Sequence, residues 1–142
     1  MRQVYLAGGI TGLSKGEAED WRNEAKEMIE SSTNRQLICF SPTDHYSEFN
    51  DSGYVNEMAA FRYDLYRLKR SDLVLVNMNN PKSLGTMAEL AIAYDHGIPI
   101  IAYFNKSSTE GHPWQQCMID EWFGSLEDAV EHILANYYTD FI

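Results

Sequence analysis

Glu89 is placed where it could do covalent chemistry. It lies in the segment SLGTMAE (residues 83–89), near the start of a helix that the pattern predicts from Thr86 to about Asp95. The helix dipole favours an ionised acid near its N-terminus, and an ionised carboxylate can attack an electrophilic carbon. Thr86 and Glu89 also have the spacing of a capping box, in which the Glu89 side chain would bond only the backbone. The spacing alone favours the cap and leaves the nucleophile as the alternative.

Asp64 is the second carboxylate that could take part in a reaction. Apolar residues recur at helical spacing between residues 54 and 68, which predicts a helix. At about 100° per residue, Asp64 faces nearly the same way as Phe61 and Leu68. A carboxylate among apolar side chains must be paired, hydrogen-bonded or protonated. Asp64 is therefore either a partner of Arg67 or a buried acid suited to proton donation.

A glycine-rich segment, GGITG (residues 8–12), directly follows an apolar strand pattern. Glycines let backbone N–H groups approach an anion or a sugar closely, so the segment could bind a ligand or could simply form a tight turn. It matches neither the dinucleotide fingerprint nor the phosphate-binding P-loop. The four histidines and two cysteines are scattered without metal-ligand spacing, and we expect neither a metal nor a cofactor.

Strand and helix patterns alternate along the chain, which is typical of an α/β fold with a parallel sheet. We expect a Rossmann- or flavodoxin-like three-layer sandwich with a mainly parallel sheet of four or five strands. Ligands of such sheets bind outside the carboxyl ends of the strands, here near residues 8–11 and 77–89. The expected strands are 4–7, 37–40, 72–76 and 98–102, with a short edge strand within 118–123; the expected helices are 16–30, 54–68, 86–95 and 125–138; residues 41–53, 79–85 and 105–116 are expected loops.

Size and charge narrow the class of protein. The 142 residues suit a single domain over 1–142. A formal net charge of −10, from 11 basic and 21 acidic residues, disfavours a general nucleic-acid surface. The sequence lacks the ~18–20-residue apolar stretch of a membrane span and the pattern of a signal peptide. With only two cysteines, we expect a cytoplasmic protein without a disulfide framework.

Taken together, these segments resemble the nucleoside 2-deoxyribosyltransferase family, including its deoxynucleotide N-glycosidase branch. The matching segments occur in the family order and cover most of residues 4–104. They are YLAGGITG (5–12), YDL (63–65), SDLVLV (71–76), SLGTMAEL (83–90) and GIPIIA (97–102).

The resemblance implies a role for each matching residue. Glu89 stands where the family has the nucleophile that attacks the anomeric carbon of deoxyribose and forms a covalent deoxyribosyl-enzyme. Asp64 matches a carboxylate that assists at the nucleobase or the sugar, and Tyr5 matches an aromatic residue that hydrogen-bonds the nucleophile. With this resemblance, catalysis becomes the favoured role of Glu89. The residues implied to bind the substrate, around the sugar 5′ end, are Gly8, Gly9, Ile10, Thr11, Ser83 and Gly85.

We therefore expect an enzyme that cleaves or exchanges the N-glycosidic bond of a 2′-deoxynucleoside or its 5′-monophosphate, without a cofactor. Thr11 stands where the hydrolase branch often has an arginine, which weighs against a monophosphate, whereas Lys82 and Ser83 keep it open. The resemblance also implies a homo-oligomer with shared active sites, and the aromatic C-terminus (137–142) fits burial at an interface. The alternatives are a non-catalytic nucleotide-binding or sensor protein on this scaffold, and an interaction domain.

Overall fold

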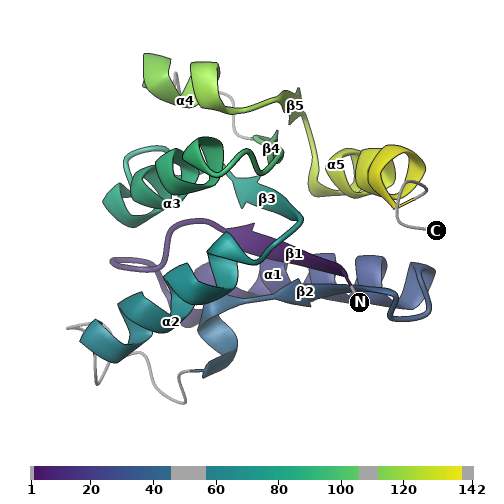
Figure 1. The fold of residues 1–142 in the computed structure, drawn as a ribbon, viewed down its shortest axis with the longest axis horizontal. Coiled ribbons are helices and arrows are strands. Elements are labelled where there is room, and N and C mark those ends of the chain that lie inside the picture. The colour runs from purple at the N-terminus through teal and green to yellow at the C-terminus, as the bar shows by residue number, and fades with distance from the viewer. Residues whose placement is uncertain (1, 46–56, 106–111, 139–142) are drawn as a thin grey trace.

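The computed structural model describes residues 2–45, 57–105 and 112–138, and they form a parallel sheet between two layers of helices (Figure 1). The five strands lie in the order β2-β1-β3-β4-β5, and every neighbouring pair is parallel. Their bounds are β1 Arg2–Ala7, β2 Leu37–Phe40, β3 Leu73–Asn77, β4 Ile100–Tyr103 and β5 Glu121–Phe123.

The helices divide between the two faces of the sheet. One face is covered by α1 (Lys15–Ser32) and α5 (Leu126–His132), which η2 (Ile133–Tyr137) extends as a short π-helix. The other face is covered by α2 (Glu57–Lys69), α3 (Leu84–Asp95) and α4 (Pro113–Met118). Figure 1 shows α2 and α3 on the side of the strands opposite to α5.

Strand β1 shows how the sequence supplies both cores. Successive side chains of a strand point to opposite faces. Val4 and Leu6 pack in the core under α1 and α5, whereas Tyr5 and Ala7 pack in the core under α2 and α3. All four are fully buried, as expected of a parallel strand covered on both faces. This alternation places the Tyr5 ring on the same face as α3.

The strand order reverses between β1 and β3. The chain leaves β1 through α1 toward β2, and leaves β3 through α3 toward β4, so the two connections cross on opposite faces. Such a switch point opens a crevice at the carboxyl ends of the two strands. The segments that border it are residues 8–14 and 78–83.

The expected α/β fold is confirmed, and the sheet has five strands. The predicted loop 105–116 is wrong at its end, because α4 begins at Pro113, where a proline at the first helical position is preset for a helix. Within the predicted loop 41–53, Pro42–His45 form a 3-10 helix, η1. Outside the described residues lie 46–53 of the first loop, 54–56 at the start of the predicted helix 54–68, 106–111 of the second loop and 139–142 of the aromatic C-terminus. None of the described helices is long and apolar enough to cross a membrane.

Candidate active site

Glu89 does not cap its helix. The N-cap of α3 is Ser83, whose Oγ accepts a hydrogen bond from the backbone N–H of Thr86, so the helix begins two residues earlier than predicted. Glu89 therefore lies in the second turn, where the helix dipole has largely faded. Its Oε2 instead accepts a hydrogen bond from the phenol of Tyr5. The capping-box interpretation is wrong, and the carboxylate is left for another role.

Tyr5 connects this carboxylate to the core of the sheet. Its ring is fully buried in β1 and lies 5.4 Å from the ring of Phe40. Burial raises the pKa of Tyr5 well above its ordinary value, and the nearby charges of Glu89 and Asp64 raise it further. The phenol therefore keeps its proton and acts as a fixed donor to Glu89.

Asp64 joins Tyr5 and Glu89 from a third element, α2. Its Oδ1 is shielded from solvent, and its charge acts on the Tyr5 phenol. Arg67, the partner that the spacing offered, donates instead to Gln3 Oε1 and, at 2.9 Å, to the hydroxyl of Tyr63. The three residues expected to be catalytic are thus gathered from β1, α2 and α3.

The environment of Glu89 tunes its protonation. Burial raises the pKa of Glu89 to about 7, while the hydrogen bond from Tyr5 and the positive charge of Arg22 act in the opposite direction. Glu89 as a residue is only partly covered. A carboxylate that ionises near neutral pH, held by a protonated phenol, is suited to nucleophilic or acid–base chemistry.

Arg22 is the residue of this region that the sequence interpretation missed. Its side chain on α1 is 1% exposed. It donates to the backbone oxygens of Leu6 at 3.3 Å and Gly8 at 3.0 Å, at the end of β1. The signal was present, because Arg22 follows Ala18 by four residues and precedes Ala25 by three, on the apolar stripe of the helix.

The glycine segment is packed tightly at its start. A Cβ on Gly8 would lie 2.9 Å from Cζ2 of Trp21, and one on Gly9 would lie 3.0 Å from Nδ2 of Asn80. Ile10 is partly covered and Thr11 is exposed. A side chain at position 8 would therefore require the Trp21 ring to shift, whereas one at position 9 would press on the end of the Asn80 side chain.

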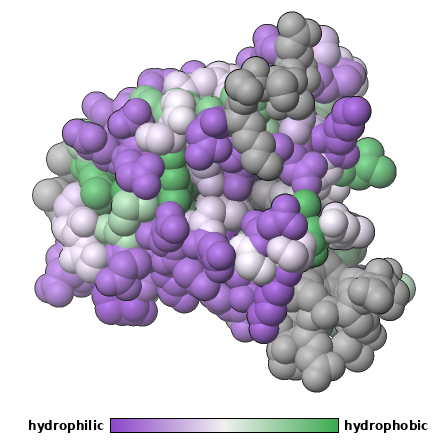
Figure 2. All heavy atoms as spheres, turned by 180° about the vertical axis from the view of Figure 1, so that it is seen from behind, coloured by the Kyte–Doolittle hydropathy of each residue, from purple (hydrophilic) through white to green (hydrophobic). Residues whose placement is uncertain are grey.

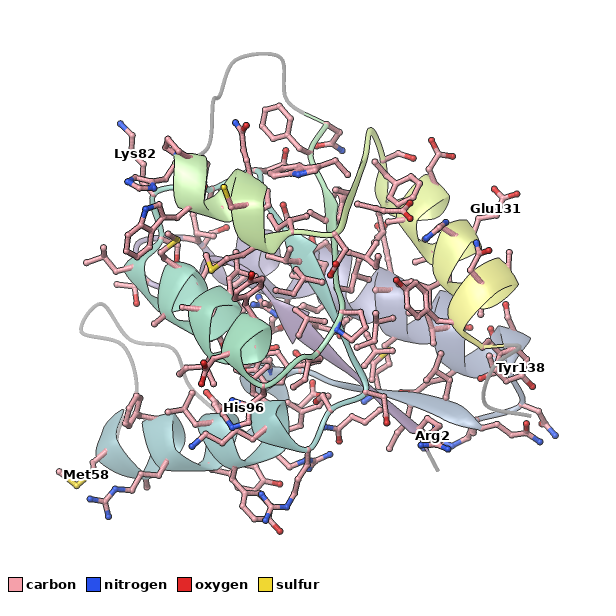
Figure 3. The ribbon with its side chains drawn as sticks, turned by 45° about the horizontal axis from the view of Figure 1, so that its top comes forward. Arg2, Met58, Lys82, His96, Glu131 and Tyr138 are labelled. Atoms are coloured by element: carbon pink, nitrogen blue, oxygen red, sulfur yellow. The ribbon has the colours of Figure 1, made fainter. Side chains whose placement is uncertain are left out.

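Ser83 lies beside the glycine segment, because Asn80 contacts Gly9 and its carbonyl accepts from the Ser83 N–H at 3.2 Å. The Ser83 Oγ accepts from the N–H and, at 3.0 Å, from the hydroxyl of Thr86, so its own proton remains available for donation. Gly85 is exposed in the first turn of α3. Lys82 points away from the fold (Figure 3).

A pocket of about 540 Å³ opens on the other face of the sheet, between α1 and α5. Gly9 of the glycine segment is among the described residues that line it, whereas Tyr5, Asp64 and Glu89 are not. Figure 2 views the molecule from behind and shows mostly hydrophilic side chains. The described parts of the chain hold no cluster of His, Cys, Asp and Glu suited to a metal. The polar lining consists of Glu17, Asp20, Glu24, Glu127, Asn77, Asn79, Asn80, Asn105 and Tyr103.

Comparison with known proteins gives a consistent picture. The family model described as nucleoside 2-deoxyribosyltransferase matches residues 4–127. No curated protein matches the chain significantly. Several solved structures share its fold at low sequence identity, among them three that follow.

The first is a conserved protein from Enterococcus faecalis V583, with 19% identity and a TM-score of 0.77 over 95% of this chain and 98% of that chain. The second is a 2-deoxyribosyltransferase from Bacillus psychrosaccharolyticus, with 18% identity and a TM-score of 0.69 over 90% of each chain. The third is a 2-deoxyribosyltransferase from Leishmania mexicana, with 14% identity and a TM-score of 0.72 over 96% of this chain and 99% of that chain.

Proposed function

Because the chain belongs to the nucleoside 2-deoxyribosyltransferase family, we propose that it cleaves or exchanges the N-glycosidic bond of a 2′-deoxynucleoside or its 5′-monophosphate, with Glu89 as the nucleophile. The observation that carries the proposal is the hydrogen bond from the buried Tyr5 phenol to a carboxylate that does not cap its helix. A structural cap would need no such partner.

The proposed reaction has two steps. In the first, a carboxylate oxygen of Glu89 bonds to the anomeric carbon, and the N-glycosidic bond breaks with its electron pair on the departing base. In the second, a ring nitrogen of another base bonds to the same carbon and loses its proton, while the ester bond to Glu89 breaks. Water in place of the second base gives hydrolysis. Two displacements at one carbon retain its configuration, as in retaining glycosidases.

Tyr5 and Asp64 assist at different stages of this reaction. The Tyr5 phenol holds one carboxylate oxygen of Glu89, so the other can face the sugar. Asp64 is the neighbouring acid that supplies or takes the proton of the base, because a departing purine or pyrimidine leaves more readily when it is protonated. Neither role requires a metal or a cofactor.

The sugar end of the substrate is assigned to residues that border the crevice at the switch point, together with Gly85 in the first turn of α3. The bordering residues are Gly8, Gly9, Ile10, Thr11 and Ser83. The exposed Thr11 hydroxyl and the Ser83 O–H can each donate one hydrogen bond. Both donors are neutral, and Lys82 points away from the fold (Figure 3). This set of donors favours a 5′-hydroxyl over a phosphate.

The test compares base release from a panel of deoxynucleosides and deoxynucleoside monophosphates, followed by chromatography with and without an acceptor base. Glu89→Gln should lose activity roughly 1,000-fold or more, as expected for a missing nucleophile. Glu24→Gln, an acid in the pocket on the opposite face, is the matched control and should stay active. Binding of a nucleoside without base release would favour a sensor, and an active Glu89→Gln would refute the nucleophile.

We also propose that copies of the chain assemble around this face. Large apolar side chains are exposed there, with Met58 64%, Phe61 61% and Leu84 87% exposed. Met58 projects from the start of α2 (Figure 3). Exposed apolar groups gathered near one site are typical of an interface. A monomer in light scattering at assay concentration would contradict this assembly, and Phe61→Ser should weaken it.

A further inference from the structure

Arg22 is a buried cation that enters the site from the opposite face of the sheet. Its guanidinium donates to three backbone oxygens: Nε to Leu6 at 3.3 Å, Nη2 to Gly8 at 3.0 Å and Nη1 to Ala18 at 2.5 Å. The Trp21 ring lies 4.8 Å from it. Burial of a charge is costly unless its donors are satisfied, so a cation retained at such a place calls for a specific reason.

The carbonyls that Arg22 holds belong to the end of β1. Leu6 directly follows Tyr5, and Gly8 is the first residue of the glycine segment. Immobilising these two carbonyls fixes the strand end from which the Tyr5 phenol reaches Glu89. It also fixes the turn beside the proposed sugar site. The planar fork of arginine can span several carbonyls at once, which a lysine ammonium on its flexible stem does not reproduce.

The positive charge of Arg22 also acts on Glu89. On Glu89, the positive charge of Arg22 and the hydrogen bond from Tyr5 both oppose the rise in pKa that burial causes. The phenol of Tyr5, on β1, is faced by Glu89 from α3, by Asp64 from α2 and by Arg22 from α1. The guanidinium also faces the Tyr103 phenol on β4.

We infer that Arg22 is a positioning residue for the Glu89 nucleophile: its guanidinium holds the end of β1 that carries Tyr5, the hydrogen-bond donor to Glu89. The inference rests on the proposed function, since it gives Arg22 a role in the same reaction. Arg22 acts through Tyr5 and the backbone and does not touch the substrate.

Two substitutions separate the two effects. Arg22→Lys keeps the charge and loses the fork, so kcat should fall roughly 10-fold at every pH while the acidic limb of the kcat/KM profile stays in place. Arg22→Met removes both, so the limb should also move to higher pH by about 0.5–1 unit. The matched control is Lys26→Met. Lys26 lies one turn further along α1, in a half-exposed ion pair with Asp44, and its substitution should leave kcat and the acidic limb unchanged.

The outcomes are decisive even when a variant folds poorly. An Arg22→Lys enzyme with the kcat of the wild type would overturn the positioning role. An Arg22→Met enzyme with an unmoved acidic limb would overturn the electrostatic role, and if it does not fold, Arg22→Gln replaces it in the same measurement.

The pKa of Glu89 can also be measured directly, by following its carboxyl signal in carbon-13 NMR as the pH changes. The signal is assigned as the one that disappears in Glu89→Gln, and the measurement tests the effect of the Arg22 charge without any turnover. If the wild type releases no base, the proposed function fails, whereas an unmoved Glu89 titration in the arginine variants refutes only the inference about Arg22.

Discussion

The two faces of the sheet hold their acidic side chains in different environments. On the face of α1 and α5, Glu17, Asp20 and Glu24 line an open pocket of about 540 Å³. On the face of α2 and α3, Glu89 is hydrogen-bonded to a buried phenol on which the charge of Asp64 also acts, and the pKa of Glu89 is raised to about 7. The face of α1 and α5 therefore has the open pocket, and the face of α2 and α3 has the carboxylate with the shifted pKa.

This difference shows that the size of a pocket and the reactivity of its lining are separate properties. An exposed carboxylate is held by water and gains little from its neighbours, whereas a covered one responds to each hydrogen bond and charge nearby. This contrast is the reason for proposing Glu89, and not an acid of the open pocket, as the nucleophile. Substitutions of matched residues on the two faces test this proposal.

The largest difference is expected between Asp64→Asn and Asp20→Asn. Loss of the acid beside Tyr5 should lower kcat/KM for base release roughly 100-fold, because proton transfer by a placed acid contributes about that much. Asp20→Asn, in the open pocket, should lower kcat/KM less than about 2-fold. Steady-state assays of both variants measure the contrast. Equal losses of kcat/KM in the two variants would mean that the active site lies in the pocket or includes residues of both faces.

A smaller difference is expected between two buried tyrosines, Tyr5→Phe and Tyr103→Phe. Tyr5 donates to Glu89 on one face, and Tyr103 lines the pocket on the other. Without the phenol of Tyr5, the pKa of Glu89 should rise, because a hydrogen bond to the ionised form is lost. Activity should fall roughly 10-fold at pH 6 and less at pH 9. The pH profile of Tyr103→Phe should keep its acidic limb, and a shifted limb there would contradict the assignment.

Two glycines sharpen the comparison through stability. A Cβ on Gly8 would meet Trp21 at 2.9 Å, while one on Gly85 would meet nothing within 4 Å. Gly8→Ala should therefore destabilise the fold by about 1–3 kcal/mol. Gly85→Ala, in the first turn of α3, should be neutral or slightly stabilising. Urea unfolding of both variants provides the measurement, and a tolerated Gly8→Ala would show that Trp21 can move aside.

The smallest effect concerns the stability of Glu89→Gln as a function of pH. Between the ordinary pKa of 4.5 and about 7, the unfolded chain releases this proton while the folded chain keeps it, so the wild type loses stability as the pH rises. The glutamine variant should escape this loss. It should gain about 1–3 kcal/mol over the wild type above pH 7 and almost nothing below pH 4.5. A gap in unfolding free energy that does not change with pH would contradict the raised pKa.

Much of the fold could be read from local patterns. Apolar runs predicted strands such as β2 at its observed bounds. At the start of α1, Ser14 and Glu17 have the spacing of a capping box, and both side chains do bond the backbone there. The same rule failed at Glu89, because Ser83 caps α3 and leaves Glu89 in the second turn. Spacing alone could not tell whether Ser83 or Thr86 caps α3, because serine and threonine are both common at this position.

The sequence by itself determined the parallel α/β architecture and, through its resemblance to a family, predicted Tyr5, Asp64 and Glu89 as the catalytic residues. The alternation of strands and the periodicity of helices depend on neighbouring residues. The order of motifs along the chain can also be recognised without a structure. Only the tertiary structure decided that Tyr5 donates to Glu89 and that Arg22 faces both from the other side of the sheet. Those contacts join residues far apart in the chain, and the pKa of a carboxyl depends on the neighbours and the burial that folding brings together.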